Sequence, residues 1–149
     1  MTIASGCELC DGDGGEVLFR GDRFRVVAVP GDEAKLYPGF CRVVWNDHVK
    51  EMTDLRSPDR DSFMAAVYRL EAVLRNTLSP VKMNLASLGN LTPHLHWHVI
   101  PRYADDAAYP KPVWALSSPA AQTATIRLPH RPAGPVDWRA AVRTEFAAG

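Results

Sequence analysis

Three histidines alternate with apolar residues in segment 94–98, which has the sequence HLHWH. Side chains of a strand point alternately to its two faces, so the three imidazoles would share one face, about 7 Å apart. The packing of a core gives no reason for such a row. Imidazoles in this arrangement can ligate a metal. Alternatively, one imidazole can attack phosphorus while its neighbours bind or protonate the phosphate oxygens.

The nucleophilic interpretation favours His96, which has a histidine two residues away on either side. It requires the far ring nitrogen to be held by an acceptor, because the near nitrogen is then unprotonated. The preceding residues 89–92, Gly-Asn-Leu-Thr, allow close backbone approach and offer neutral donors to a phosphate, although such loops are common. The alternative that the histidines are ordinary surface groups explains one such residue better than it explains three.

Cysteines supply a second candidate site. Cys7 and Cys10 form a C-x-x-C pair, which in a cytosolic protein is typical of metal binding or redox chemistry. The alternative is a pair of reduced thiols. The odd total of three cysteines argues against a disulfide framework, and Cys41, inside an apolar run, is expected in the core.

The composition is that of an ordinary globular domain. The 149 residues are 46% hydrophobic and 23% charged, with a formal net charge of zero. This balance gives no sign of a nucleic-acid or membrane partner. The sequence also has no apolar run long enough to cross a membrane and does not begin like a secretory signal, so we expect a cytoplasmic protein.

The predicted elements give an α+β domain with a largely antiparallel sheet. Apolar and β-branched runs predict strands at residues 16–20, 23–29, 40–46, 82–88 and 94–100. Ser57-Pro58 begins a long helix, with Ser57 as its N-cap, that ends at Ser79-Pro80. We further expect a loop at 30–39, an extended Pro- and Ala-rich segment at 104–136 and a short helix at 137–148.

The run from His94 to Ile100 resembles the motif of the histidine triad (HIT) superfamily. Flanking positions agree with that motif, namely Pro38-Gly39, His48, Asn84, Gly89-Asn90 and Pro101-Arg102. The resemblance covers about residues 7–103. It implies a HIT domain over residues 1–103, with a five-stranded, mostly antiparallel sheet and one long helix. Residues 104–149 would form a C-terminal proline-rich tail packed on the domain or on a dimer partner.

The resemblance also implies a nucleotide hydrolase or nucleotidyl transferase, commonly a homodimer without an organic cofactor. The substrates would be dinucleoside polyphosphates, nucleoside phosphoramidates or similar nucleotides, attacked at the α-phosphate. His96 would carry a covalent nucleotidyl group, and His98 would contact the phosphate and supply a hydrogen bond or a proton. The implied nucleotide-binding residues are Asp32, Asn84, Gly89, Asn90, Thr92 and His98.

Some HIT proteins, and the related galactose-1-phosphate uridylyltransferases, hold a structural zinc ion. The corresponding ligands in this chain are Cys7, Cys10, His48 and His94. Two cysteines and two histidines suit a closed tetrahedral zinc site. This site would remove His94 from the catalytic set and would brace the strand that carries His96.

Three positions depart from the pattern. Phe40 and Asn90 replace a common histidine and glutamine, and Leu91 stands where a hydroxyl residue is usual. Two alternatives therefore remain open. The histidine row could hold a catalytic metal in a metallohydrolase, or the chain could be a nucleotide-binding module with weakened activity.

Overall fold

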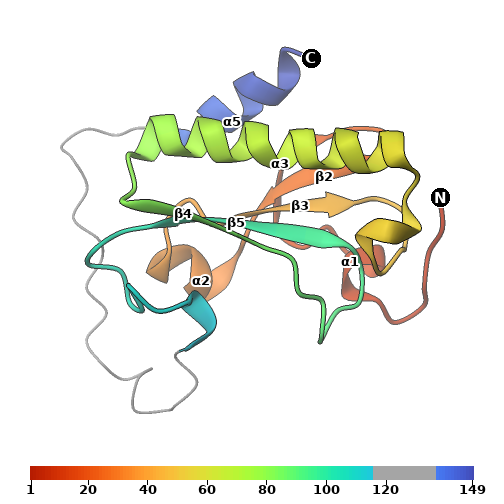
Figure 1. Cartoon of the computed structure of the whole chain (residues 1–149), viewed down its shortest axis with the longest axis horizontal. Coiled ribbons are helices and arrows are strands. Elements are labelled where there is room, and N and C mark those ends of the chain that lie inside the picture. Colours follow the sequence, from red (N-terminus) through yellow and green to blue (C-terminus); the bar gives the residue numbers. More distant parts are fainter. Residues whose placement is uncertain (116–136) are drawn as a thin grey trace.

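The architecture is a single antiparallel sheet with its two longer helices on one face (Figure 1). The computed structural model describes residues 1–115 and 137–149. Its five-stranded sheet has the order β1-β2-β3-β5-β4, and every neighbouring pair is antiparallel. The bounds are β1 Glu16–Arg20, β2 Phe24–Ala28, β3 Cys41–Trp45, β4 Lys82–Ala86 and β5 His96–Arg102. The predicted α+β class and five strands are confirmed.

The long helix α3 (Ser57–Leu78) covers one face of the sheet. It buries Phe63, Val67, Leu70 and Leu74, whose three- and four-residue spacing lines one side of a helix. The helix follows a 3-10 turn, η1 (Met52–Asp54). It was expected to take Ser57 as its N-cap, but Arg56 occupies that position and Ser57 begins the first turn. A left-handed Ser79 ends the helix.

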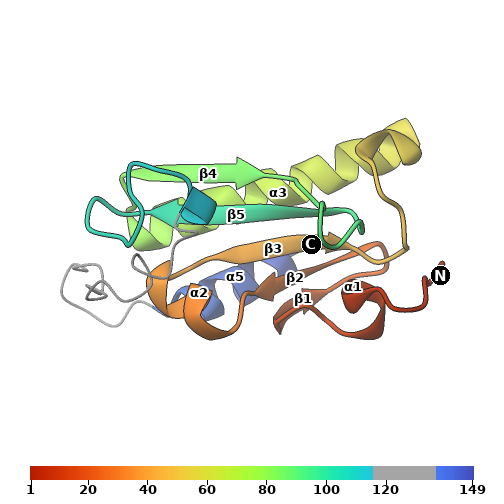
Figure 2. The same cartoon turned by 90° about the horizontal axis from the view of Figure 1, so that it is seen from below.

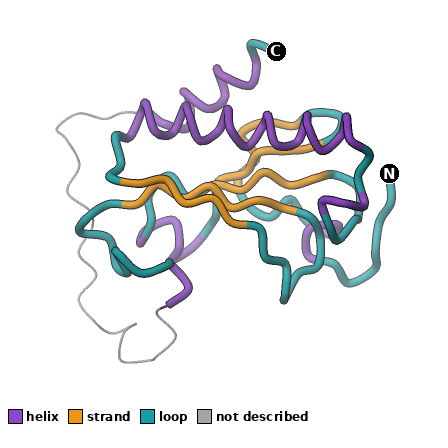
Figure 3. The backbone as a smooth tube through the Cα atoms, in the orientation of Figure 1, coloured by secondary structure: helices purple, strands orange, loops and turns teal. Residues whose placement is uncertain are grey.

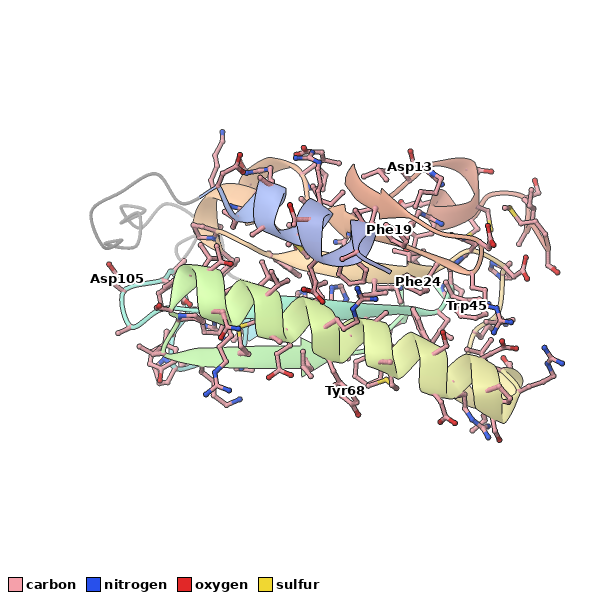
Figure 4. The ribbon with its side chains drawn as sticks, turned by 90° about the horizontal axis from the view of Figure 1, so that it is seen from above. Asp13, Phe19, Phe24, Trp45, Tyr68 and Asp105 are labelled. Atoms are coloured by element: carbon pink, nitrogen blue, oxygen red, sulfur yellow. The ribbon has the colours of Figure 1, made fainter. Side chains whose placement is uncertain are left out.

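The C-terminal helix α5 (Trp138–Ala147) runs beside α3 over the same face (Figure 4). It packs on α3 and β1 and buries Trp138, Val142 and Phe146, one side of the helix. The predicted terminal helix is therefore confirmed. The proposed division into residues 1–103 and 104–149 stays a prediction, and residues 116–136 of the predicted extended segment lie outside the described residues.

Among residues 1–115 and 137–149, the elements on the opposite face of the sheet are short (Figures 2 and 3). These are α1 (Glu8–Asp11), α2 (Gly31–Leu36) and the 3-10 turn η2 (Val113–Ala115). The prediction of a loop at 30–39 missed α2, because Pro30 and Pro38 flank this helix rather than interrupt it. None of the described helices is long and apolar enough to span a bilayer.

Candidate functional site

The strand β5 places His96 and His98 on the face of the sheet away from α3. Leu95 and Val99 lie in the core beneath α3, so the alternating histidines point the other way. Both histidine side chains are buried. His94 lies just before β5 rather than within it, and it too is buried.

The hydrogen bonds of His96 determine its tautomer. Its Nδ1 lies 2.6 Å from the carbonyl oxygen of His94. A carbonyl oxygen only accepts, so Nδ1 carries the proton and Nε2 keeps its lone pair. His96 thus has the held far nitrogen and unprotonated near nitrogen that a nucleophile needs.

The neighbouring ring of His98 faces this lone pair. The two Nε2 atoms are 3.2 Å apart, so the Nε2–H of His98 donates to Nε2 of His96. Burial lowers the pKa of both imidazoles, with a further contribution from the Arg42 guanidinium. For His98 burial, followed by the effects of His96 and Arg42, lowers the pKa to about 3. Both rings are therefore neutral near pH 7 in the substrate-free protein.

Asn84 is oriented by a buried arginine. Its Oδ1 accepts a hydrogen bond from Nη1 of Arg102 at 2.8 Å, which leaves its amide N–H groups as the donors. Arg102 in turn forms a two-pronged ion pair with Asp106, at 2.8 and 3.0 Å. Because Asp106 also accepts hydrogen bonds from backbone N–H groups of residues 103, 108 and 109, it ties the segment after β5 to the sheet.

This segment brings Trp114, which the sequence analysis did not select, against His98. Their ring centroids are 4.9 Å apart in an edge-on arrangement. Trp114 also borders a groove of about 460 Å³ between β4, β5 and η2, lined in part by Asn84, Leu85 and Ile100. A groove of this volume falls in the size range of small-ligand sites. The sequence gives no sign that Trp114 belongs to the site, because 15 residues separate it from His98. Only its position in the folded structure shows the contact.

The remaining predicted nucleotide-binding residues lie in the short helix α2 or in the loop before β5. Asp32 is exposed in the first turn of α2. Gly89 has a left-handed backbone, φ +87°, and an added Cβ would come within 3.2 Å of the carbonyl oxygen of Thr92. Asn90 is exposed, and the Thr92 hydroxyl donates to Glu8 at 3.4 Å. Their contact with a nucleotide stays a prediction.

The departures from the family pattern fall into two environments. Phe40 is buried, and its ring centroid is 5.7 Å from that of His98, so an apolar ring borders the sheet face that carries His96 and His98. Leu91 is 98% exposed in the loop before β5. The first change therefore alters the site directly, while the second lies at the surface.

The four predicted metal ligands meet beside the start of β5. One ligand atom from each of Cys7, Cys10, His48 and His94 lies within 4.8 Å of the others. The distances from Cys7 Sγ to His94 Nδ1, and from Cys10 Sγ to Nδ1 of His48 and of His94, are 3.4–3.5 Å. A tetrahedral zinc ion with ordinary bond lengths separates sulfur and nitrogen ligands by about 3.6 Å. The side chains therefore fit a zinc ion.

The tautomer of His94 agrees with that role. Its Nε2 lies 2.6 Å from the carbonyl oxygen of Trp45 and must carry the proton that it donates. Nδ1, which faces both sulfurs, then keeps the lone pair that a metal ligand requires. His94 thus belongs to the cysteine cluster, and its backbone carbonyl holds His96.

Comparisons with known proteins agree with this geometry. The sequence model of the HIT domain matches residues 22–105. Over 78 residues the chain is 35% identical to a protein named AP-4-A phosphorylase in two strains of Mycobacterium tuberculosis, CDC 1551 / Oshkosh and H37Rv. That match covers 48% of this chain and only 40% of the relative's length.

Solved structures show the same fold. A histidine triad protein from Bradyrhizobium japonicum superposes with a TM-score of 0.68 at 24% identity, covering 89% of this chain and 91% of that one. A histidine triad protein from Marinobacter aquaeolei gives a TM-score of 0.68 at 21% identity, with coverages of 99% and 96%. At these identities the similarity concerns the fold.

Proposed function

Because this chain belongs to the HIT domain family, we propose that it cleaves dinucleoside polyphosphates or related nucleotides at the α-phosphate through a covalent intermediate on His96. The observation that carries the proposal is the tautomer of His96, with Nδ1 held by the His94 carbonyl and Nε2 unprotonated. The similarity to the AP-4-A phosphorylases supports a dinucleoside polyphosphate as the substrate class.

In the first step, Nε2 of His96 attacks the α-phosphorus. A phosphorus–nitrogen bond forms, and the bond from phosphorus to the bridging oxygen breaks, so its electron pair leaves with the phosphate chain. The Nε2–H of His98, turned from His96 to the phosphate, hydrogen-bonds an oxygen on which negative charge grows. The incoming phosphate also favours a protonated His98, because a nearby anion opposes the effect of burial.

In the second step, water or another acceptor such as inorganic phosphate attacks the same phosphorus. The phosphorus–nitrogen bond breaks, and its electron pair returns to His96. A proton from the attacking water passes to solvent through His98. The groove beside Trp114 would hold one of the two groups attached to the phosphate, and Asp32 would serve the ribose as predicted.

The metallohydrolase alternative has less support. Among the described residues, the cluster that suits a metal takes His94 alone from the triad and fills its other positions with Cys7, Cys10 and His48. We propose that this cluster holds a structural zinc ion, which would tie the N-terminal segment to the start of β5. We also propose a homodimer and retain the cytoplasm as the expected location.

Product analysis tests the proposed reaction. Purified protein is incubated with diadenosine tetraphosphate, with a nucleoside phosphoramidate and with a sugar nucleotide, and the products are separated by anion-exchange chromatography. We expect the nucleoside monophosphate of the cleaved nucleotide, which is AMP together with ATP for diadenosine tetraphosphate, or ADP together with ATP when inorganic phosphate is the acceptor. Binding of these nucleotides without turnover of any of them would support the weakened binding module instead.

A further inference from the structure

An arginine that the sequence analysis did not select lies directly across from His98 on the neighbouring strand. In the antiparallel pairing of β3 with β5, Arg42 is the partner of His98. Cross-strand partners share a face of the sheet, with Cβ atoms about 4.5–5.5 Å apart. The Arg42 side chain, 22% exposed, therefore begins beside the His98 ring.

Two buried side-chain polar atoms in the described ranges, 1–115 and 137–149, have no hydrogen-bond partner. They are Nε of Arg42 and Nδ1 of His98. Buried polar atoms are nearly always paired, so each such atom requires an explanation. While the Nε2–H of His98 donates to His96, Nδ1 of the neutral ring holds a lone pair, and it becomes a donor only when a bound anion favours the charged imidazolium. An anionic ligand between these two strands would then give both atoms a partner.

The charge around Arg42 defines the chemistry of this ligand. Nε of an arginine can only donate, so the ligand must supply an acceptor. The guanidinium makes two long contacts, at 3.4 Å to the Glu33 carboxylate and 3.3 Å to the Gly14 carbonyl. Glu33 itself is 42% exposed, so solvent weakens this ion pair. The nearby Phe40 ring offers no donor, whereas Arg42 brings a positive charge to the same face of the sheet as His98.

We propose that Arg42 is a catalytic residue that binds a non-bridging oxygen of the substrate's reacting phosphate together with His98. The inference rests on the proposed function and adds a positively charged residue to the proposed catalytic site. Nε–H and one terminal N–H of the guanidinium suit the two oxygens of a phosphate. Glu33 is then a temporary partner that holds the guanidinium until a phosphate replaces it. As His96 attacks, Arg42 stabilises the negative charge on the phosphate oxygens.

Binding measurements test the role of Arg42 separately from turnover. The dissociation constants of AMP, adenosine and inorganic pyrophosphate are measured by calorimetry for the wild-type protein and for Arg42→Gln. We expect AMP and pyrophosphate to bind on the order of 10–100-fold more weakly to the variant, as for a lost charge-assisted hydrogen bond, while adenosine binds equally. Arg60→Gln, in the first turn of α3, where the arginine donates to the Ser57 hydroxyl, is the matched control and should change none of these constants.

Two further variants separate anion binding from a structural role. Arg42→Lys keeps the charge but loses Nε–H and the fork, so its AMP affinity should lie between those of the wild type and Arg42→Gln. Glu33→Gln removes the competing carboxylate and should tighten AMP binding a few-fold, which a purely structural arginine would not explain. In ¹⁵N NMR spectra, AMP should shift the Nδ1 resonance of His98 in the wild type and much less in Arg42→Lys.

The outcomes distinguish this inference from the proposed function. An AMP affinity unchanged in folded Arg42→Gln would overturn the role of Arg42 and leave the function intact. If Arg42→Gln does not fold, the other two variants decide. The role of Arg42 is then overturned if Arg42→Lys binds AMP with wild-type affinity and Glu33→Gln does not change the AMP affinity. Pyrophosphate binding that depends on Arg42, without nucleotide cleavage, would support the anion site and refute the function. If the wild type binds neither AMP nor pyrophosphate, both are wrong.

Discussion

The buried ion pair between Arg102 and Asp106 is expected to support both the fold and the orientation of Asn84. The side chains are 2% and 0% exposed and make two hydrogen bonds, at 2.8 and 3.0 Å. Arg102→Met would leave the Asp106 carboxylate buried without its counter-ion. Breaking such a pair from one side costs about 3–5 kcal/mol, a large share of the total stability of about 5–15 kcal/mol.

The matched control is an ion pair of similar length at the surface. Arg143 and Glu16 lie 2.7 Å apart with side chains 47% and 48% exposed. Arg143→Met should cost no more than about 1 kcal/mol, because water screens exposed charges. Burial rather than distance therefore decides the difference between the two variants.

Urea unfolding and steady-state kinetics measure the two effects of Arg102→Met. Besides the loss of stability, we expect kcat/KM to fall about tenfold, since Asn84 loses the bond that orients it. Adding Asp106→Asn removes the unpaired charge and keeps an acceptor for the backbone, so it should restore about 1–2 kcal/mol but not the activity. A loss below about 1 kcal/mol in Arg102→Met, equal to that of Arg143→Met, would refute this reasoning.

Three further predictions concern the zinc site, pH and the groove. Purified protein should contain about one zinc ion per chain by elemental analysis. The Cys10→Ser variant should lose this ion and melt at a temperature roughly 10 °C lower. A wild-type protein that is as stable without metal as with it would exclude the site. With the pKa of His98 lowered by burial to about 3, the unfolded chain binds protons first as pH falls below about 6.5. The free energy of unfolding should therefore fall between about pH 6.5 and about pH 3, by up to about 1.4 kcal/mol per pH unit. Urea unfolding at several pH values measures this slope for the wild type and for His98→Phe. An equally steep slope in His98→Phe would contradict the prediction. Trp114→Ala should raise KM several-fold with little change in kcat, and an unaltered KM would exclude substrate binding in the groove.

Local sequence patterns predicted the parts of the fold that depend on local chemistry. The alternation around His96 correctly placed His96 and His98 on one face of a strand, but His94 lies just before that strand. Helical spacing and the Ser57-Pro58 and Ser79-Pro80 boundaries correctly predicted the long helix α3. The short helix α2 was missed because its flanking prolines suggested a loop. Six residues are too few to show a helical pattern of buried side chains.

Contacts between residues that are far apart in the sequence could not be predicted from it. The position of Arg42 opposite His98 depends on the order and register of β3 and β5, which the individual strands do not encode. The contact of Trp114 with His98 depends on the path of the chain after β5. The acceptor that holds His96 was required by its chemistry, but only the structure identifies it as the backbone carbonyl of His94.

The most direct test of the central claim is to trap the nucleotidyl group on His96. Wild-type protein is quenched during turnover of diadenosine tetraphosphate under conditions that preserve phosphorus–nitrogen bonds, digested and analysed by mass spectrometry. We expect an adenylyl mass increment on the peptide that contains His96, and its absence from His96→Ala, whose rate should be lower by at least roughly 10³-fold while the fold is kept. For His98→Ala the adduct should still form, with a rate lower on the order of 10²-fold. An unmodified His96 peptide in a turning-over enzyme, or near-normal activity of His96→Ala, would contradict the assignment of the nucleophile.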